Sequence, residues 1–168
     1  MPTWRDYDNP DADYALWKNR FSDKYVLLCR THHFDKKMKE FEDSEGFFVD
    51  VTNYPDVNEL YWVSDILISD YSSAFFDFGL LGKPMFCFAN DYDKYVSTRG
   101  LFIYLKNEFP SGIKETDEQL ISAIFNMDYD NECERTKQYV AKYVSHTTNA
   151  TNACLDRLYE LLNQTNKS

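Results

Sequence analysis

Short apolar runs alternate with longer stretches in which apolar residues recur at helical spacing. The apolar runs cover residues 25–29, 47–51, 66–68 and 85–88, and the last of them opens after Pro84. Runs of this length with few polar interruptions predict strands that are buried on both faces. Such strands are typical of a parallel sheet covered by helices on its two sides.

The segments between and after these runs predict helices. Asp56 follows Pro55 and is a suitable N-cap, Gly82 is a suitable residue just beyond a helix end, and Thr116 with Gln119 resembles a capping box. The predicted helices span residues 11–21, 34–41, 56–63, 73–81, 116–126, 132–144 and 148–163. The alternation of side chains over residues 101–105 is ambiguous and does not decide which element they form.

This order of elements predicts an α/β fold: a Rossmann-like parallel sheet with helices on both faces and additional helices at the C-terminal end. We expect residues 1–163 to form a single nucleotide-binding domain and residues 164–168 to be a polar tail. Leu155, Leu158, Tyr159 and Leu162 give the last helix an apolar stripe.

Composition and charge narrow the classes of function. The net charge of −10 repels phosphate backbones, so nucleic acid is not an expected partner, although a small anion can still bind to local donors. The four cysteines lack CxxC spacing, and we expect Cys29 and Cys87 to be buried thiols and the chain to hold no metal and no cofactor. The longest apolar runs are far shorter than the roughly 20 residues of a membrane helix.

Polar segments follow three of the predicted strands, at residues 30–33, 69–73 and 89–93. Ligands of an open parallel sheet bind beyond the carboxyl ends of its strands. If these strands are parallel neighbours, the three segments meet at one edge of the sheet.

Within these segments several residues could carry chemistry. Arg30, Thr31 and His32 come directly after the first strand, and an arginine with a histidine suits a phosphate ligand. Ser72 and Ser73 stand where a strand turns into a helix, a place where unpaired N–H groups and hydroxyls can bind an anion. Plain helix capping is an equally good interpretation of the two serines. Asp77 lies one turn further along and either faces the same ligand or is a solvated carboxylate.

Several segments, in chain order, resemble the CDP-glycerol glycerophosphotransferase family, whose members build or prime teichoic-acid-like polymers. They are PTWRD at residues 2–6, RTH at 30–32, DVNEL at 56–60, SDILISDYSSAFFDF at 64–78, GKP at 82–84, and Tyr95 with Arg99-Gly100. The similarity spans residues 1 to about 125. His33 stands where the family has proline, and Pro110-Ser111-Gly112 stands where it tends to have PGP.

The resemblance implies the C-terminal, donor-binding half of a two-domain GT-B enzyme that transfers glycerol phosphate from CDP-glycerol to a hydroxyl of a lipid-linked or polymeric acceptor. It implies that His32 is catalytic, that Ser72 and Ser73 bind the diphosphate and that Asp77 completes the site. It adds Arg30, Thr31, Thr3, Trp4 and Arg5 as substrate-binding residues.

The resemblance also implies a second histidine, on an N-terminal domain that we expect this chain to lack, so we expect a fragment without turnover of its own. The whole enzyme is expected in the cytoplasm, peripheral at the inner face of the cell membrane, with no insertion by this domain. A GT-B glycosyltransferase that uses a nucleotide sugar, a ribitol phosphate transferase and a non-catalytic scaffold remain alternatives. A receiver-like signalling module fits poorly, because it requires an acidic pair after the first strand.

Overall fold

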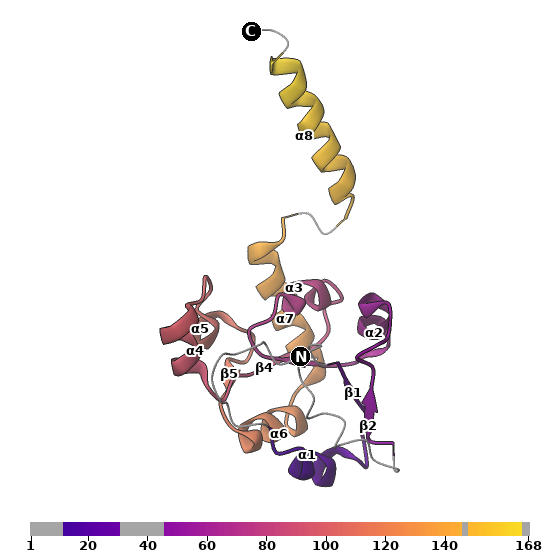
Figure 1. Ribbon diagram of the computed structural model, residues 1–168, viewed down its shortest axis with the longest axis vertical. Helices are drawn as coiled ribbons and strands as arrows, with labels where there is room; N and C mark the ends of the chain where they lie inside the picture. The colour runs from indigo at the N-terminus through magenta and orange to yellow at the C-terminus, as the bar shows by residue number, and fades with distance from the viewer. Residues whose placement is uncertain (1–11, 31–45, 146–147, 166–168) are drawn as a thin grey trace.

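The computed structural model describes residues 12–30, 46–145 and 148–165. Within these residues helices and short strands alternate as the sequence predicts (Figure 1). The strands are β1 (Leu27–Cys29), β2 (Phe48–Asp50), β3 (Leu67–Ser69), β4 (Met85–Phe88) and β5 (Ile113–Lys114). The helices are α1 (Tyr14–Phe21), α2 (Val57–Val63), α3 (Ala74–Gly79), α4 (Tyr92–Arg99), α5 (Leu105–Glu108), α6 (Asp117–Phe125), α7 (Tyr129–Tyr143) and α8 (Ala150–Thr165).

The strands that the structure describes pair in parallel and form two sheets. One sheet has the order β1-β2, and the other has the order β3-β4-β5. In the register of the second sheet, Leu67 lies opposite Met85 and Cys87 lies opposite Ile113. Because parallel strands all point the same way, the segments that follow them leave each sheet at a common edge.

Helices cover both faces of β4, and its side chains alternate between two cores. Met85 and Cys87 pack with aromatic residues of α3 and α7, whereas Phe86 packs with Trp17 and Phe21 of α1 and with residues of α6. A strand with no exposed face is continuously apolar, which explains the MFCF sequence. The predicted α/β fold with parallel strands and helices on both faces is therefore confirmed.

Polar side chains fix several helix ends. Asp13, Asp56, Thr116 and Asp128 each accept a hydrogen bond from a backbone N–H in the first turn of the helix that follows. At the other end of α2, the Lys83 ammonium donates to the carbonyls of Tyr61, Trp62 and Ser64 at 3.4, 2.8 and 2.7 Å. Lys83 therefore holds the C-terminus of α2 against the loop before β4.

Some local structure differs from the sequence prediction. Residues 92–99 form α4, although the sequence predicts a strand-end segment over residues 89–93, and Ile113–Lys114 forms the two-residue strand β5. The ambiguous segment 101–105 is not a strand, and its last residue, Leu105, begins α5. The predicted helix 34–41 lies outside the described residues.

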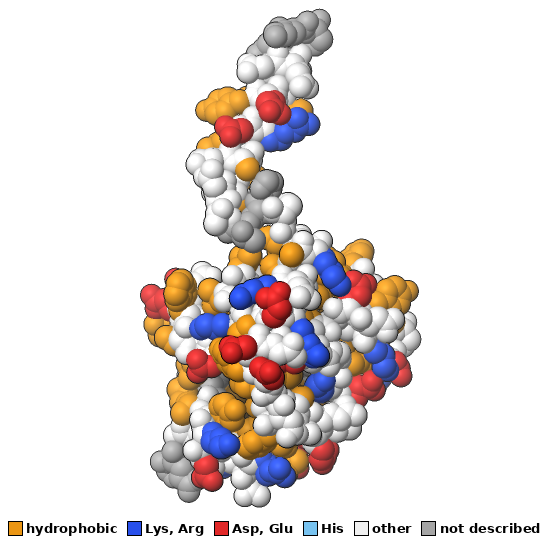
Figure 2. Space-filling view, turned by 180° about the vertical axis from the view of Figure 1, so that it is seen from behind, with side chains coloured by type: hydrophobic (Ala, Val, Ile, Leu, Met, Phe, Trp, Pro, Cys, Tyr) orange, Lys and Arg blue, Asp and Glu red, His pale blue; other side chains and the backbone are white. Residues whose placement is uncertain are grey.

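The last helix stands clear of the body of the molecule (Figure 1). Its apolar stripe is exposed, with Leu155, Leu158, Tyr159 and Leu162 each between 44% and 64% accessible. Figure 2 shows apolar side chains uncovered along this part of the molecule, while acidic and basic side chains are interspersed over the body. No helix in the described part of the chain is long and apolar enough to cross a membrane.

Candidate functional site

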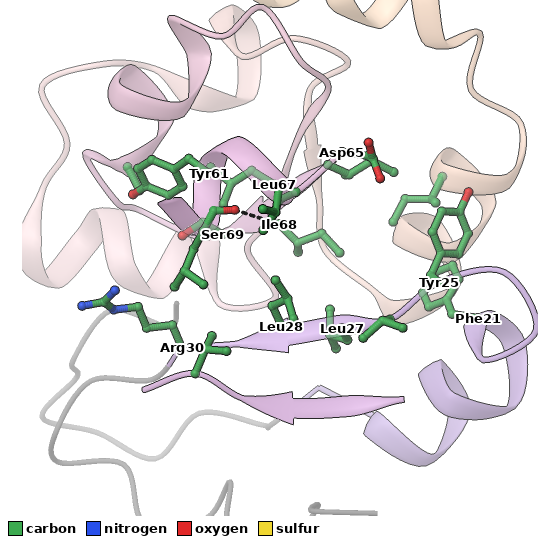
Figure 3. A pocket seen from close by; sticks show the side chains of 18 of the residues that line it. Phe21, Tyr25, Leu27, Leu28, Arg30, Tyr61, Asp65, Leu67, Ile68 and Ser69 are labelled. Carbon is green, nitrogen blue, oxygen red and sulfur yellow. Dashed lines mark hydrogen bonds between the residues drawn. The ribbon is translucent and has the colours of Figure 1, made fainter. Parts of the chain in front are cut away.

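A cleft of about 440 Å³ lies between β1 and β3, where the two sheets face each other without pairing. Its walls are mostly apolar and include Leu27, Leu28 and Ile68. Figure 3 shows Arg30, Tyr61 and Ser69 together at one end, with Phe21 and Tyr25 at the other. The polar end is formed where β1 and β3 end, which is the edge at which the sequence predicts a ligand.

Arg30 brings an unsatisfied positive group to this end of the cleft. Its Nη1 atom is buried and has no hydrogen-bond partner among the described residues. A buried guanidinium N–H without an acceptor is energetically costly, and such exceptions require an explanation. A carboxylate or phosphate oxygen is the acceptor that a guanidinium binds best, so this end of the cleft suits an anion.

Tyr61 on α2 lines the cleft, and the charges of two predicted site residues act on its hydroxyl. The pKa of its hydroxyl is raised above the ordinary value by burial first and by the negative charge of Asp77 second, while the positive charge of Arg30 opposes the rise. Both charges therefore act on one phenol, although Arg30 follows β1 and Asp77 belongs to α3. Arg30 lines the cleft together with Tyr61, whereas Asp77 is exposed on α3 and is not among the residues that line it.

Ser72 and Ser73 precede α3 as predicted, but they have different roles in the turn. The Ser72 hydroxyl accepts a hydrogen bond from the Ala74 N–H at 3.1 Å, whereas Ser73, the N-cap, makes no side-chain cap bond. The N–H groups of Phe75 and Phe76 bond to the carbonyls of Ser72 and Ser73. These early N–H groups are used within the turn, whereas the hydroxyl protons of Ser72 and Ser73 can be donated to an anion.

The turn after β3 is tied to the turn after β4. The Cys87 thiol donates to the carbonyl of Asp70 at 3.3 Å, and the Tyr71 hydroxyl donates to Asp91 Oδ1 at 2.7 Å. The Tyr71 ring also stacks on Tyr95, with ring centroids 3.6 Å apart. Two of the three strand-end segments that were predicted to meet are therefore in direct contact.

The remaining predicted site residues cannot be located in the same way. Thr3, Trp4, Arg5, Thr31 and His32 lie outside the described residues.

From the sequence, Tyr61 had no assigned role, and Ser69, Asp91 and Tyr95 entered only as parts of the predicted strand-end segments or of the family-like motifs. Tyr61 lies in the helix that begins with the DVNEL segment, and only the fold shows that it lines the cleft.

The buried cysteines behave as the sequence predicts. Cys29 and Cys87 are buried free thiols, and burial raises the pKa of Cys29 to about 12 and raises that of Cys87 as well. A thiol with such a pKa stays protonated and is a poor nucleophile. Across residues 12–30, 46–145 and 148–165, no group of three or more His, Cys, Asp or Glu side chains is arranged to hold a metal ion.

A known protein family matches most of this chain. The model of the family described as CDP-Glycerol:Poly(glycerophosphate) glycerophosphotransferase matches residues 1–161.

Curated relatives agree with that match. The chain is 36% identical over 137 residues to a teichoic acid glycerol-phosphate transferase of Staphylococcus aureus, which covers 76% of this chain and 35% of the relative. It is also 31% identical over 140 residues to the teichoic acid ribitol-phosphate polymerase TarL of the same species, covering 78% of this chain and 25% of TarL. The chain thus spans about a third or less of the length of these relatives.

Solved structures extend the likeness to the whole chain. The wall teichoic acid polymerase TagF superposes with a TM-score of 0.70 at 28% identity, covering 99% of this chain and 43% of TagF. A TagF variant soaked with CDPG for 30 minutes gives a TM-score of 0.71 at 30% identity, covering 99% of this chain and 42% of that one. The described fold and the sequence match therefore point to the same group of transferases.

Proposed function

Because this chain belongs to the CDP-glycerol:poly(glycerophosphate) glycerophosphotransferase family, we propose that it is the donor-binding domain of an enzyme that uses CDP-glycerol in the synthesis of a teichoic-acid-like polymer. The observation that carries the proposal is the buried, unpartnered Nη1 of Arg30 at the polar end of the cleft. A diphosphate would supply the missing acceptor. The soak of a TagF variant with CDPG supports the choice of ligand.

In the proposed reaction, an acceptor hydroxyl attacks the β-phosphorus of CDP-glycerol. A new P–O bond forms to the acceptor oxygen, the bond between the β-phosphorus and the bridging oxygen breaks, and CMP leaves with the bonding electron pair. The hydroxyl proton passes to a base, which we assign to an N-terminal domain in the part of the longer relatives that this chain does not match. The product is the acceptor extended by one glycerol phosphate.

The residues of this chain would stabilise the charge that develops on the leaving group. Arg30 and the hydroxyls of Ser72 and Ser73 would donate to diphosphate oxygens, and Asp77 would bind a polar group of the donor. His32 would donate a hydrogen bond or a proton at the diphosphate, with Thr31, Thr3, Trp4 and Arg5 lining the same site. Preorganised donors of this kind usually contribute more to catalysis than any other effect, and loss of one costs about 3 kcal/mol.

The proposal extends to partners and location. The acceptor is a lipid-linked or polymeric glycerol phosphate that reaches the donor from the side of the N-terminal domain. The complete enzyme works in the cytoplasm, peripherally at the inner face of the cell membrane, and residues 1–163 act as a single nucleotide-binding domain within it.

Ribitol phosphate transfer is a second candidate, because TarL is similar to this chain over a comparable length. Both reactions release CMP and require the same diphosphate contacts, so the contacts described above favour neither alcohol.

Binding of donors to the 168-residue chain tests the proposal. We expect calorimetry to show binding of CDP-glycerol or CDP-ribitol and none of UDP-glucose, and we expect no CMP release by the chain alone. Binding of UDP-glucose without either CDP-alcohol would favour the glycosyltransferase alternative instead. In an enzyme that includes the N-terminal domain, His32→Ala should lower turnover at least about 100-fold, as expected for loss of a donor to the transition state.

A further inference from the structure

Tyr71 links the two turns that border the predicted diphosphate site. It directly precedes Ser72, and its hydroxyl donates to Asp91 Oδ1 at 2.7 Å. Asp91 is buried and is the N-cap residue of α4, while the Tyr71 ring stacks on Tyr95 one turn into the same helix. A single side chain therefore contacts α4 in two ways, through a directional hydrogen bond and through a stacked ring.

Hydrogen bonds also hold the turn on either side of Tyr71. The carbonyl of Asp70 accepts from the Cys87 thiol, and the Ser72 hydroxyl accepts from the Ala74 N–H. Tyr71 lies between these bonds and directly before the two serines, so its contacts with α4 bear on where Ser72 and Ser73 lie. A shift of about 1 Å at a binding group is enough to lose much of its contribution.

We propose that Tyr71 is a positioning residue that aims the Ser72 and Ser73 hydroxyls at the donor diphosphate, through its hydrogen bond to Asp91 and its stack on Tyr95. This inference rests on the proposed function, because it needs an anion at the two serines. Tyr71 itself need not touch the ligand. The stack alone would be preserved by phenylalanine, so the hydroxyl supplies the directional part of the link.

The experiment measures the affinity of the 168-residue chain for CDP-glycerol by calorimetry. Tyr71→Phe keeps the ring and removes the hydroxyl, and we expect it to weaken binding by about tenfold, the size expected for loss of one directional contact. Tyr92→Phe is the matched control, because it removes another phenol hydroxyl at the start of α4, one that accepts from the Lys106 N–H at 3.5 Å. Its affinity should stay within about twofold of that of the wild-type chain.

A double-mutant cycle separates positioning from general destabilisation. If Tyr71 acts through the two serines, then adding Tyr71→Phe to a chain that carries both Ser72→Ala and Ser73→Ala should weaken binding by less than about twofold, whereas the same change weakens the wild-type chain about tenfold. Additive losses would mean that Tyr71 and the two serines act independently and would overturn the inference, as would an unchanged affinity in Tyr71→Phe.

The two proposals fail in different ways. A wild-type chain that binds neither CDP-glycerol nor CDP-ribitol refutes the proposed function. A wild-type chain that binds, together with a Tyr71→Phe variant that binds equally well, refutes only the inference about Tyr71. Thermal unfolding of each variant checks that the chain is folded at the temperature of the titration.

Discussion

Replacing Arg30 with methionine should move stability and donor binding in opposite directions. Arg30 Nη1 is buried without a hydrogen-bond partner among the described residues, and a group left unsatisfied in this way costs about 1–3 kcal/mol. Because the side chain as a whole is only half-buried, we take the lower end of that range. Methionine keeps the apolar stem and removes the polar head. The free energy of unfolding should therefore rise by about 1 kcal/mol.

The same substitution removes the proposed contact with the diphosphate. A hydrogen bond to a charged group contributes about 1.5–3 kcal/mol, which corresponds to a loss of roughly 10- to 150-fold in the affinity for CDP-glycerol. A residue that only supported the fold would show the opposite combination, with lower stability and little effect on a ligand.

Urea denaturation measures the first quantity, and titration calorimetry with CDP-glycerol measures the second. Arg20→Met is the control, because Arg20 is exposed on α1, where its guanidinium lies 5.8 Å from the centre of the Phe125 ring. It changes the net charge equally, so it accounts for any long-range electrostatic effect on an anionic ligand. An Arg30→Met chain that is less stable and still binds CDP-glycerol with wild-type affinity would refute the reasoning.

Four further predictions concern stability. Gly79→Ala places a Cβ 2.4 Å from Val140 Cγ2, so urea denaturation should show that the free energy of unfolding falls by about 1–3 kcal/mol. The loss should disappear in a Val140→Ala background. A loss that persists there contradicts the close approach of α3 and α7. Lys83→Met removes the donor to the end of α2 and should lower the free energy of unfolding by about 1–2 kcal/mol, whereas Lys142→Met on α7 should have little effect. The pKa of Cys29 is raised to about 12 from 9.0. The stability that its burial provides is therefore present below pH 9 and is lost as the pH rises toward 12. Urea midpoints should fall over this pH range, and they should fall less in Cys29→Ala. In calorimetry, the melting temperature of a chain that ends at Ser145 should lie within about 2 °C of that of the full chain, because the apolar side chains of α8 are exposed. A larger drop in melting temperature would show that α8 packs on the body.

The parts of the fold that depend on local pattern were predicted well. Residues 85–88 form a strand with the predicted bounds, because MFCF is apolar on both faces and is preceded by Pro84. Helix α6 begins after Thr116, whose side chain accepts from the Gln119 N–H as the capping pattern indicates. In each case the signal lies within a few residues of the structure that it specifies.

Helix α4 could not be predicted from local pattern. Its sequence, YDKYVSTR, has low helical amphipathicity, and the helix is positioned by Tyr92 in the core and by the stack of Tyr95 on Tyr71. These are contacts with residues distant in sequence, and tertiary packing overrides weak local preference. Strand β5 has two residues and exists only because β4 lies beside it.

The sequence selects candidate site residues, which stay predictions, but not the geometry around them. The rule that ligands bind beyond the carboxyl ends of parallel strands was enough to select Arg30 and the two serines. It could not show that the N–H groups of Phe75 and Phe76 are already bonded within the turn, or that Tyr61 lines the cleft together with Arg30. Those facts depend on the rotation of α2 and on the exact residue at which α3 begins.

The division of the strands into two sheets has a mechanical consequence. Each wall of the cleft is stiffened by its own backbone ladder, but across the gap the described residues of β1 and β3 face each other through side chains such as Leu28 and Ile68. Widening or narrowing that gap deforms soft van der Waals contacts and breaks no ladder hydrogen bond. The spacing between Arg30 and the β3 wall is therefore a dimension of the cleft that can change while each wall keeps its shape.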